Sequence, residues 1–79
     1  MEKSDKRYVS THNKIKKTFE QLVLTHAYGD ITVSMLVREV GINRKTFYLH
    51  YPSLEALMDE LVESIAEEIV TYMQLQKLH

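Results

Sequence analysis

The 79-residue sequence has no cysteine, one proline and only two glycines. Without cysteine, neither a disulfide framework nor a thiolate metal site can stabilise the fold. Strand-and-turn architectures need frequent glycine or proline, so their scarcity favours an all-α chain. No apolar run approaches the ~18 residues of a membrane span, and the first ten residues lack the apolar stretch of a secretory signal. We therefore expect a soluble, cytoplasmic protein.

The chain has apolar material for one small core, with 44% hydrophobic and 27% charged residues. Domains usually run to ~100–200 residues, which leaves no room for two. Chains of this length bury only about 60% of the surface that is exposed on unfolding. Such a domain is marginally stable unless another segment or another chain covers its exposed apolar faces.

The net charge of −1 conceals an uneven distribution of charge. Residues 1–50 carry nine Lys and Arg against five Asp and Glu, whereas residues 51–79 carry one lysine against six acids. This asymmetry indicates an anion-binding first part, such as a nucleic-acid binder. A solvated mixture of charges without function is the alternative, because surface charge mainly governs solubility and association.

The apolar pattern divides the chain into three parts. Residues 1–12 are expected to form a flexible basic arm, with Tyr8 and Val9 as their only apolar anchors. Residues 13–60 follow with helical periodicity, and the first helix is predicted over about 13–27. Gly29 is predicted to take the left-handed conformation just past the end of this helix.

Capping residues predict the next two helices. Thr32 is a candidate N-cap for a helix of about eight residues that ends at Gly41. Asn43 is a candidate N-cap for a helix from about Arg44 to His50, which the following proline, Pro52, prevents from continuing.

A fourth helix of up to ~25 residues is predicted from Leu54 onward, with Ser53 as its N-cap. Its first two turns, Leu54–Leu61, should pack on the preceding helices. Residues 61–79 are interpreted as the start of a truncated connecting helix, and they carry an apolar stripe that is expected to be exposed: Ile65, Ile69, Tyr72 and Met73.

The two short helices and their glycine turn are typical of a helix-turn-helix, in which the second helix enters the DNA major groove. Four apolar residues would form the core under the crossing: Leu36, Val40, Ile42 and Phe47. The outward residues of the second helix are Arg44, Lys45, Thr46, Tyr48, Leu49 and His50. These side chains suit phosphate contacts, base-edge hydrogen bonds and contact with a thymine methyl group. An ordinary helical hairpin with a polar outer face remains possible from the pattern alone.

The run ITVSMLVREVGINRKTFYLHYPSLEAL over residues 31–57, with its TxxxLxxxxGxxxxTxYxH core, closely resembles the DNA-binding domain of the tetracycline-repressor (TetR) family of bacterial transcription regulators. The resemblance covers roughly residues 13–60. It implies a three-helix, homeodomain-like unit that a long fourth helix joins to a larger domain for dimerisation and ligand binding. The expected function is operator binding as part of a homodimeric repressor, with a small-molecule effector bound only by that missing domain.

Carried over residue by residue, the resemblance places Arg44, Thr46, Leu49 and His50 against the operator and Tyr48 against phosphate. Two residues of the preceding helix add to this set: Thr32, which approaches the DNA backbone, and Ser34, which in some members reaches a base.

Three residues depart from the family pattern. Leu54 replaces a lysine that contacts phosphate in many members, and Lys45, which replaces a common glycine or proline, could supply that contact. Val37 replaces a usual alanine where two helices approach closely. Packing against the fourth helix is the alternative role for Tyr48 and His50.

Other functions have less support in the sequence. An enzyme is not expected, because the chain has no cysteine nucleophile, phosphate loop or metal constellation. The four histidines lack the spacing of a metal-binding helix, so no metal or other cofactor is expected. A helical protein-interaction module that uses the apolar stripe of the last helix is the main alternative. Self-association through residues 62–79 is predicted on the same basis.

Overall fold

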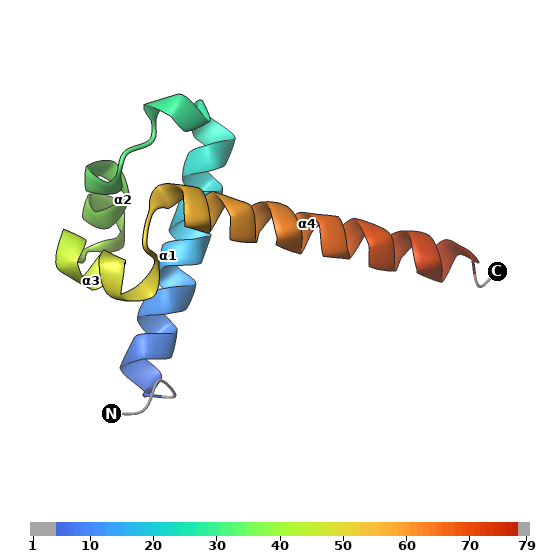
Figure 1. Ribbon diagram of the computed structural model, residues 1–79, viewed down its shortest axis with the longest axis horizontal. Coiled ribbons are helices and arrows are strands. Elements are labelled where there is room, and N and C mark those ends of the chain that lie inside the picture. The colour runs from blue at the N-terminus through green and yellow to red at the C-terminus, as the bar shows by residue number, and fades with distance from the viewer. Residues whose placement is uncertain (1–4, 78–79) are drawn as a thin grey trace.

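The computed structural model describes residues 5–77. Over this range the elements are α1 (Lys6–Thr25), a 3₁₀ turn (Tyr28–Asp30), α2 (Val33–Val40), α3 (Arg44–His50) and α4 (Leu54–Lys77), with no strand. Figure 1 shows the first three helices grouped into one body and α4 leaving that body as a long rod. The prediction of an all-α fold with a long fourth helix is confirmed for the described residues.

Helix α1 begins at Lys6 and not at Asn13, so the prediction of a flexible arm is wrong for residues 6–12. An N-cap explains why the helix starts early. The Asp5 carboxylate accepts a hydrogen bond from the Arg7 backbone amide at 2.8 Å and caps the helix. Residues 1–4 of the predicted arm lie outside the described residues. The early start adds two turns of helix to the face that meets α3.

The two glycines have different roles. Helix α1 ends at Thr25, two residues earlier than the predicted Ala27, and the chain then forms the 3₁₀ turn around Gly29. Gly29 has no positive φ, so the prediction of a left-handed residue there is wrong. Gly41 has φ +90° and its amide donates to the Val37 carbonyl oxygen at 2.8 Å, which ends α2 and turns the chain toward α3.

The bounds predicted for α2 and α3 are confirmed, because side chains cap both helices. The Thr32 hydroxyl accepts from the Met35 amide at 3.1 Å, and the Asn43 side chain accepts from the Thr46 amide at 2.8 Å. Each cap satisfies an amide that has no partner within its own helix. The turn between the two helices is therefore fixed on both sides.

One hydrophobic core joins all four helices. Its buried residues are Ile15, Phe19, Leu22, Ile31, Leu36, Val37, Val40, Phe47, Tyr51 and Leu57. Three of the four residues predicted to lie under the crossing are buried, and the fourth, Ile42, is half-buried against this core. Burial of α2 and α3 from one side leaves their other sides free.

Helix α4 belongs to the core only at its beginning. Ser53 accepts from the Ala56 amide at 3.1 Å, Leu57 is buried, and Leu54, Met58 and Leu61 pack partly against the core. Beyond Leu61 the large apolar side chains are exposed, as predicted: Val62, Ile65, Ile69, Val70, Tyr72, Met73 and Leu75. No helix within residues 5–77 is long and apolar enough to cross a membrane.

Candidate nucleic-acid interface

One side of helix α3 is buried in the core, and the opposite side is exposed to solvent. The Phe47 side chain is fully buried, and Tyr51 directly after the helix is also buried. Each residue advances an α-helix by about 100°, so Lys45 and Leu49 lie opposite Phe47. Leu49 is 72% exposed, and Lys45 is exposed beside it. A cation and a large aliphatic side chain therefore stand together on the outer surface of α3.

The remaining predicted residues of α3 flank this pair. Arg44 is exposed at the first turn, Tyr48 is 46% exposed, and Thr46 is half-buried. The Tyr48 ring packs edge-on against Phe47, with centroids 5.2 Å apart and planes at 74°. This contact packs one part of the ring while nearly half of the residue stays exposed. We call the four exposed residues Arg44, Lys45, Tyr48 and Leu49 the α3 face.

Residues from the start of α2 lie beside the start of α3. The Arg44 Nη1 donates a hydrogen bond to the Ser34 Oγ at 2.6 Å, although the two residues are ten positions apart. Thr32, two residues before Ser34, is exposed, and its hydroxyl oxygen caps the N-terminus of α2. The structure thus brings Ser34 and Arg44 together, with Thr32 two residues before Ser34 at the N-cap of α2.

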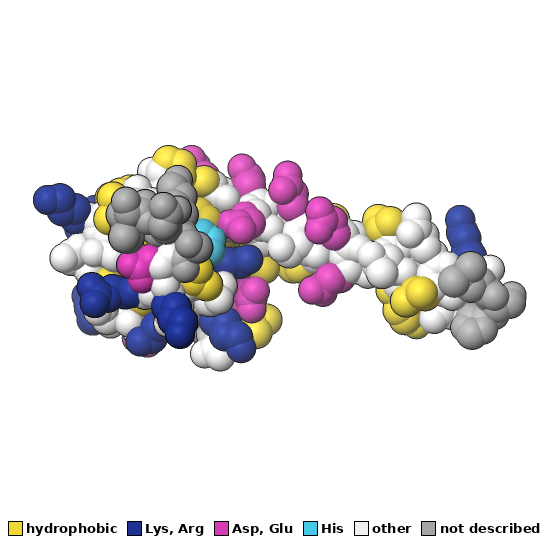
Figure 2. All heavy atoms as spheres, turned by 90° about the horizontal axis from the view of Figure 1, so that it is seen from below, with side chains coloured by type: hydrophobic (Ala, Val, Ile, Leu, Met, Phe, Trp, Pro, Cys, Tyr) yellow, Lys and Arg dark blue, Asp and Glu magenta, His cyan; other side chains and the backbone are white. Residues whose placement is uncertain are grey.

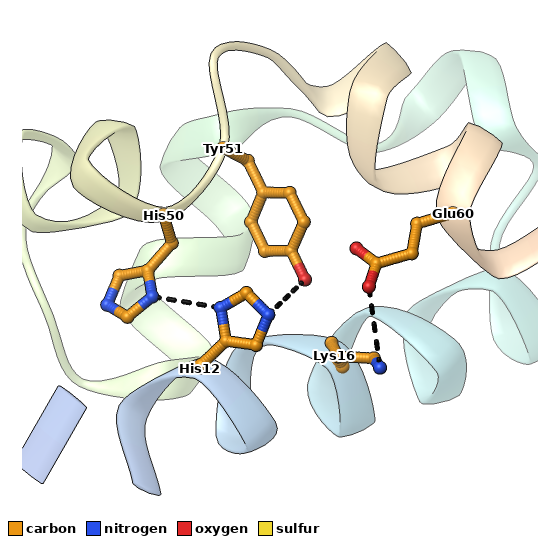
Figure 3. Close-up of polar contacts among 5 residues, drawn as sticks. All are labelled: His12, Lys16, His50, Tyr51 and Glu60. Carbon is orange, nitrogen blue, oxygen red and sulfur yellow. Dashed lines mark hydrogen bonds and ion pairs between the residues drawn. The ribbon is translucent and has the colours of Figure 1, made fainter. Parts of the chain in front are cut away.

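His50 occupies a different environment from the α3 face. It is half-buried, and its ring stacks on Tyr8 of α1 with centroids 4.2 Å apart. Its Nδ1 lies 3.0 Å from the Nδ1 of His12, and the His12 Nε2 lies 3.1 Å from the Tyr51 hydroxyl (Figure 3). The structure therefore places His50 against α1, and not against α4 as the alternative had it.

These hydrogen bonds limit the charge that the two histidines can carry. In the contact between the two Nδ1 atoms, one nitrogen must donate a proton and the other must accept it. The pair can keep this contact with one positive charge at most. Burial, and secondarily the positive charge of His12, lower the pKa of His50 below its usual 6.5.

Tyr51 and Glu60 extend the polar cluster toward α4. Burial, followed by the neighbouring Glu60 carboxylate, raises the pKa of Tyr51 above its usual range. Glu60 also forms an ion pair with Lys16 of α1, at 3.5 Å. Both partners are more than a third exposed, so this pair contributes little to stability. Figure 3 shows the cluster linking His12 and Lys16 of α1 with His50 and Tyr51 at the end of α3 and with Glu60 of α4.

Tyr8 and His12 hold the α1 side of this contact, although both fall in the segment predicted to be an arm. The sequence carries a signal for their role, because both have helical spacing with Ile15, Phe19 and Leu22, the buried residues of α1. Within residues 5–77, no group of three or more His, Cys, Asp or Glu side chains is placed to hold a metal ion.

The surface charges are separated between the body and the rod. Figure 2 shows Lys and Arg gathered mainly over the body of α1 to α3, and Asp and Glu along the part of α4 that adjoins it. The acidic residues of α4 are Glu55, Asp59, Glu60, Glu63, Glu67 and Glu68. The charge split noted in the sequence is thus a split in space, and two of the cations on the body, Arg44 and Lys45, belong to the α3 face.

Two short helices, a left-handed glycine turn and an exposed cationic face on the second helix define a helix-turn-helix domain of the DNA-binding class. Comparison with known proteins identifies the family. Residues 19–61 match the model of the bacterial regulatory proteins, tetR family. The chain belongs to the TetR family, whose members are transcriptional regulators and not enzymes.

Individual relatives agree with this assignment. The chain is 32% identical over 72 residues to the uncharacterized HTH-type transcriptional regulator YxbF of Bacillus subtilis. This alignment covers 90% of this chain and 19% of the relative. It is 31% identical over 65 residues to the dhaKLM operon transcriptional activator DhaS of Lactococcus lactis, covering 82% and 35% of the two chains. It is 35% identical over 51 residues to the regulator EthR of Mycolicibacterium smegmatis, covering 65% and 24%.

The match therefore spans about a fifth to a third of each of these relatives. No solved structure matches the chain. Together, the family match and the fold make this chain a helix-turn-helix domain of the TetR family.

Proposed function

We propose that the chain binds a specific operator sequence by placing α3 in the DNA major groove. The observation that carries this proposal is the α3 face: Phe47 and Tyr51 fix the helix from behind, while Lys45 and Leu49 point away from the core. A helix presented in this way fits the major groove, which is about 12 Å wide.

The exposed residues divide by chemistry into phosphate and base contacts. Lys45 supplies a positive charge for phosphate, and the hydroxyl of Tyr48 can donate a hydrogen bond to a phosphate oxygen. Arg44 and Thr46 can hydrogen-bond to base edges, and Leu49 suits a thymine methyl group. Thr32 precedes the first residue of α2, from which its side chain can approach the DNA backbone, whereas the Ser34 hydroxyl accepts a hydrogen bond from Arg44. Helical pattern and family resemblance both assign His50 to the operator, but it is half-buried and its ring stacks on Tyr8 of α1, so we propose no base contact for it.

We further propose that the whole regulator is a homodimeric, cytoplasmic repressor. The chain corresponds to about a fifth to a third of its relatives, whose remaining length offers room for dimerisation and for binding an effector. Two α3 helices would then enter major grooves ~34–36 Å apart, and an effector that changes their separation would change affinity. A single domain is expected to bind DNA only weakly, with a Kd of ~10⁻⁴–10⁻⁶ M.

Amide NMR spectra of the labelled chain, recorded while a short DNA duplex is added, test the proposal. At low salt, shifts should cluster at Thr32, Ser34 and residues 44–50, and they should shrink at about three times the salt concentration because phosphate contacts release counterions. Absence of shifts at low salt would contradict DNA binding by this surface.

The apolar part of α4 supports a second candidate function, docking of a partner helix. A groove between α1 and α4 is lined by Val23, Leu24, Leu61 and Ile65, with Glu20 and Glu68 at its edges. Apolar grooves of this kind accept an amphipathic helix. In the same titration, shifts confined to residues 61–76, or duplex binding that survives high salt, would favour this candidate.

A further inference from the structure

We propose that Ser34 is a positioning residue, which holds the Arg44 guanidinium in the orientation that reads a guanine. This inference rests on the proposed function, because it concerns how the α3 face recognises a base. Its basis is the hydrogen bond from Arg44 Nη1 to Ser34 Oγ, which at 2.6 Å is short for a contact between two exposed side chains.

The hydrogen bond is suited to orientation and not to holding the fold together. Both residues are exposed, and the two helices are already joined by the buried side chains Leu36, Val40 and Phe47. A surface hydrogen bond adds little to the stability of such a core. Its main effect is to restrict an arginine side chain, which otherwise has many rotamers of similar energy.

Serine can orient the guanidinium without neutralising it. A carboxylate partner would remove the positive charge from the α3 face, but none of the ion pairs found in residues 5–77 involves Arg44. A guanidinium has five N–H donors, and the contact with Ser34 uses one of them on Nη1. The edge formed by Nε and Nη2 keeps its full set of donors.

That free edge matches a guanine. Two parallel N–H groups of arginine pair with the O6 and N7 acceptors of guanine in the major groove, which is the commonest specific contact to a base. Arg44 is the first residue of α3, and residues near the start of a recognition helix are those that reach base edges. Restricting Arg44 before binding reduces the entropy that its ordering would cost.

A double-mutant cycle separates positioning from direct contact. The probe is a 16-base-pair duplex selected by the chain from a pool with a randomised centre, and binding is measured by fluorescence anisotropy at low salt. We expect Ser34→Ala to weaken binding roughly 2- to 10-fold, because the Arg44 side chain would then be mobile before binding and its ordering would cost entropy. In an Arg44→Ala background, the same change should have no effect. Additive losses would overturn the proposal, since Ser34 would then act on DNA independently.

A modified base tests the guanine contact itself. Replacing one guanine of the selected duplex by 7-deazaguanine removes the N7 acceptor. At the guanine read by Arg44, this replacement should weaken duplex binding most for the wild type and less for Ser34→Ala. It should not change binding by Arg44→Ala. Ser34→Thr keeps a hydroxyl and should restore the wild-type response, whereas Thr71→Ala is the matched control that removes a hydroxyl from the exposed end of α4. Equal responses of the wild type and Ser34→Ala would contradict the proposal.

A measurement without DNA distinguishes failure of this inference from failure of the proposed function. In the free chain, ¹⁵N relaxation of the Arg44 Nε–H group should report an ordered side chain that becomes more mobile in Ser34→Ala. If no duplex is selected but this ordering is found, sequence-specific binding fails and with it the guanine-reading role. If a duplex is selected and Arg44 is equally mobile in both proteins, the positioning role alone is overturned.

Discussion

Lys45 lies beside Leu49 on the side of α3 opposite Phe47, and the two side chains should respond differently to substitution. A lysine that neutralises a phosphate contributes equally to binding of every sequence. An aliphatic side chain against a thymine methyl contributes only where that base is present. If the proposed roles hold, substitutions of the pair should separate affinity from sequence preference within one turn of helix.

We predict that Lys45→Ala weakens binding of all duplexes to a similar extent. Loss of one phosphate contact should reduce the slope of log affinity against log salt by about 0.9. Titrations at four salt concentrations, with two unrelated duplexes, measure this slope. Lys77→Ala, which removes a lysine from the far end of α4, is the control, and an unchanged slope in Lys45→Ala would contradict the assignment.

The histidine cluster predicts a loss of stability in acid. Because the pKa of His50 is lowered in the folded state, the unfolded chain binds more protons below the ordinary value of about 6.5. The free energy of unfolding should therefore decrease as the pH falls through 6.5 toward the lowered pKa, and should be retained above 6.5. Urea unfolding at several pH values between 5 and 8 measures the effect.

The matched controls for this prediction are two glutamine variants. His50→Gln should flatten the pH dependence of the free energy of unfolding. His26→Gln should leave this dependence as in the wild type, because the His26 side chain is exposed and its hydrogen bonds are to the end of its own helix. A ring-proton NMR titration of His50 with a midpoint at or above 6.5 would refute the assigned cause.

At the scale of elements, the turn between α2 and α3 depends on one backbone conformation. At Gly41, with φ +90°, an added Cβ would meet no atom within 4 Å, so alanine would be opposed by backbone strain and not by a clash. We predict that Gly41→Ala lowers the free energy of unfolding by about 1–2 kcal/mol. Gly29 also has open space around its Cα but no positive φ, so Gly29→Ala should cost much less. Urea denaturation of both variants makes the comparison, and equal losses would argue against strain at Gly41.

The same elements explain which parts of the fold the sequence could predict. The approximate bounds predicted for α2 and α3 agree with the structure, because Thr32, Asn43 and Gly41 are local signals whose effect does not depend on distant contacts. The start of α1 was not predicted. Its first two turns are sparse in aliphatic residues and are held by Tyr8 and His12, whose partners His50 and Tyr51 lie far along the chain.

Predictions for the site follow the same division. Outward placement of Lys45 and Leu49 follows from helical geometry around Phe47 and could be predicted. The link between Ser34 and Arg44 could not, because it depends on the angle between two helices and on the rotamer of a long side chain. The half-buried position of His50 likewise required knowledge of where α1 begins.

For the whole molecule, the exposed stripe on α4 predicts self-association. Ile65, Ile69, Tyr72 and Met73 are each about half exposed or more, and a stripe of this size is normally covered by another surface. We expect sedimentation velocity to show dimers or larger species of the chain as its concentration rises. Ile69→Glu should shift the chain toward monomer, and Glu68→Gln on the same turn is the polar control. Only monomer at high concentration would contradict this expectation.

The long fourth helix also acts as a lever. Only its first two turns, up to Leu61, pack against the body, and the remaining residues extend away from it (Figure 1). At 1.5 Å per residue, the segment from Leu61 to Lys77 is about 24 Å long, so a tilt of about 5° at its base moves its far end by about 2 Å. Conversely, a small displacement applied at the far end is converted into a rotation of the body and of α3 with it. The distance between the core and the tip of α4 thus sets how finely the orientation of the α3 face can be adjusted from outside the domain.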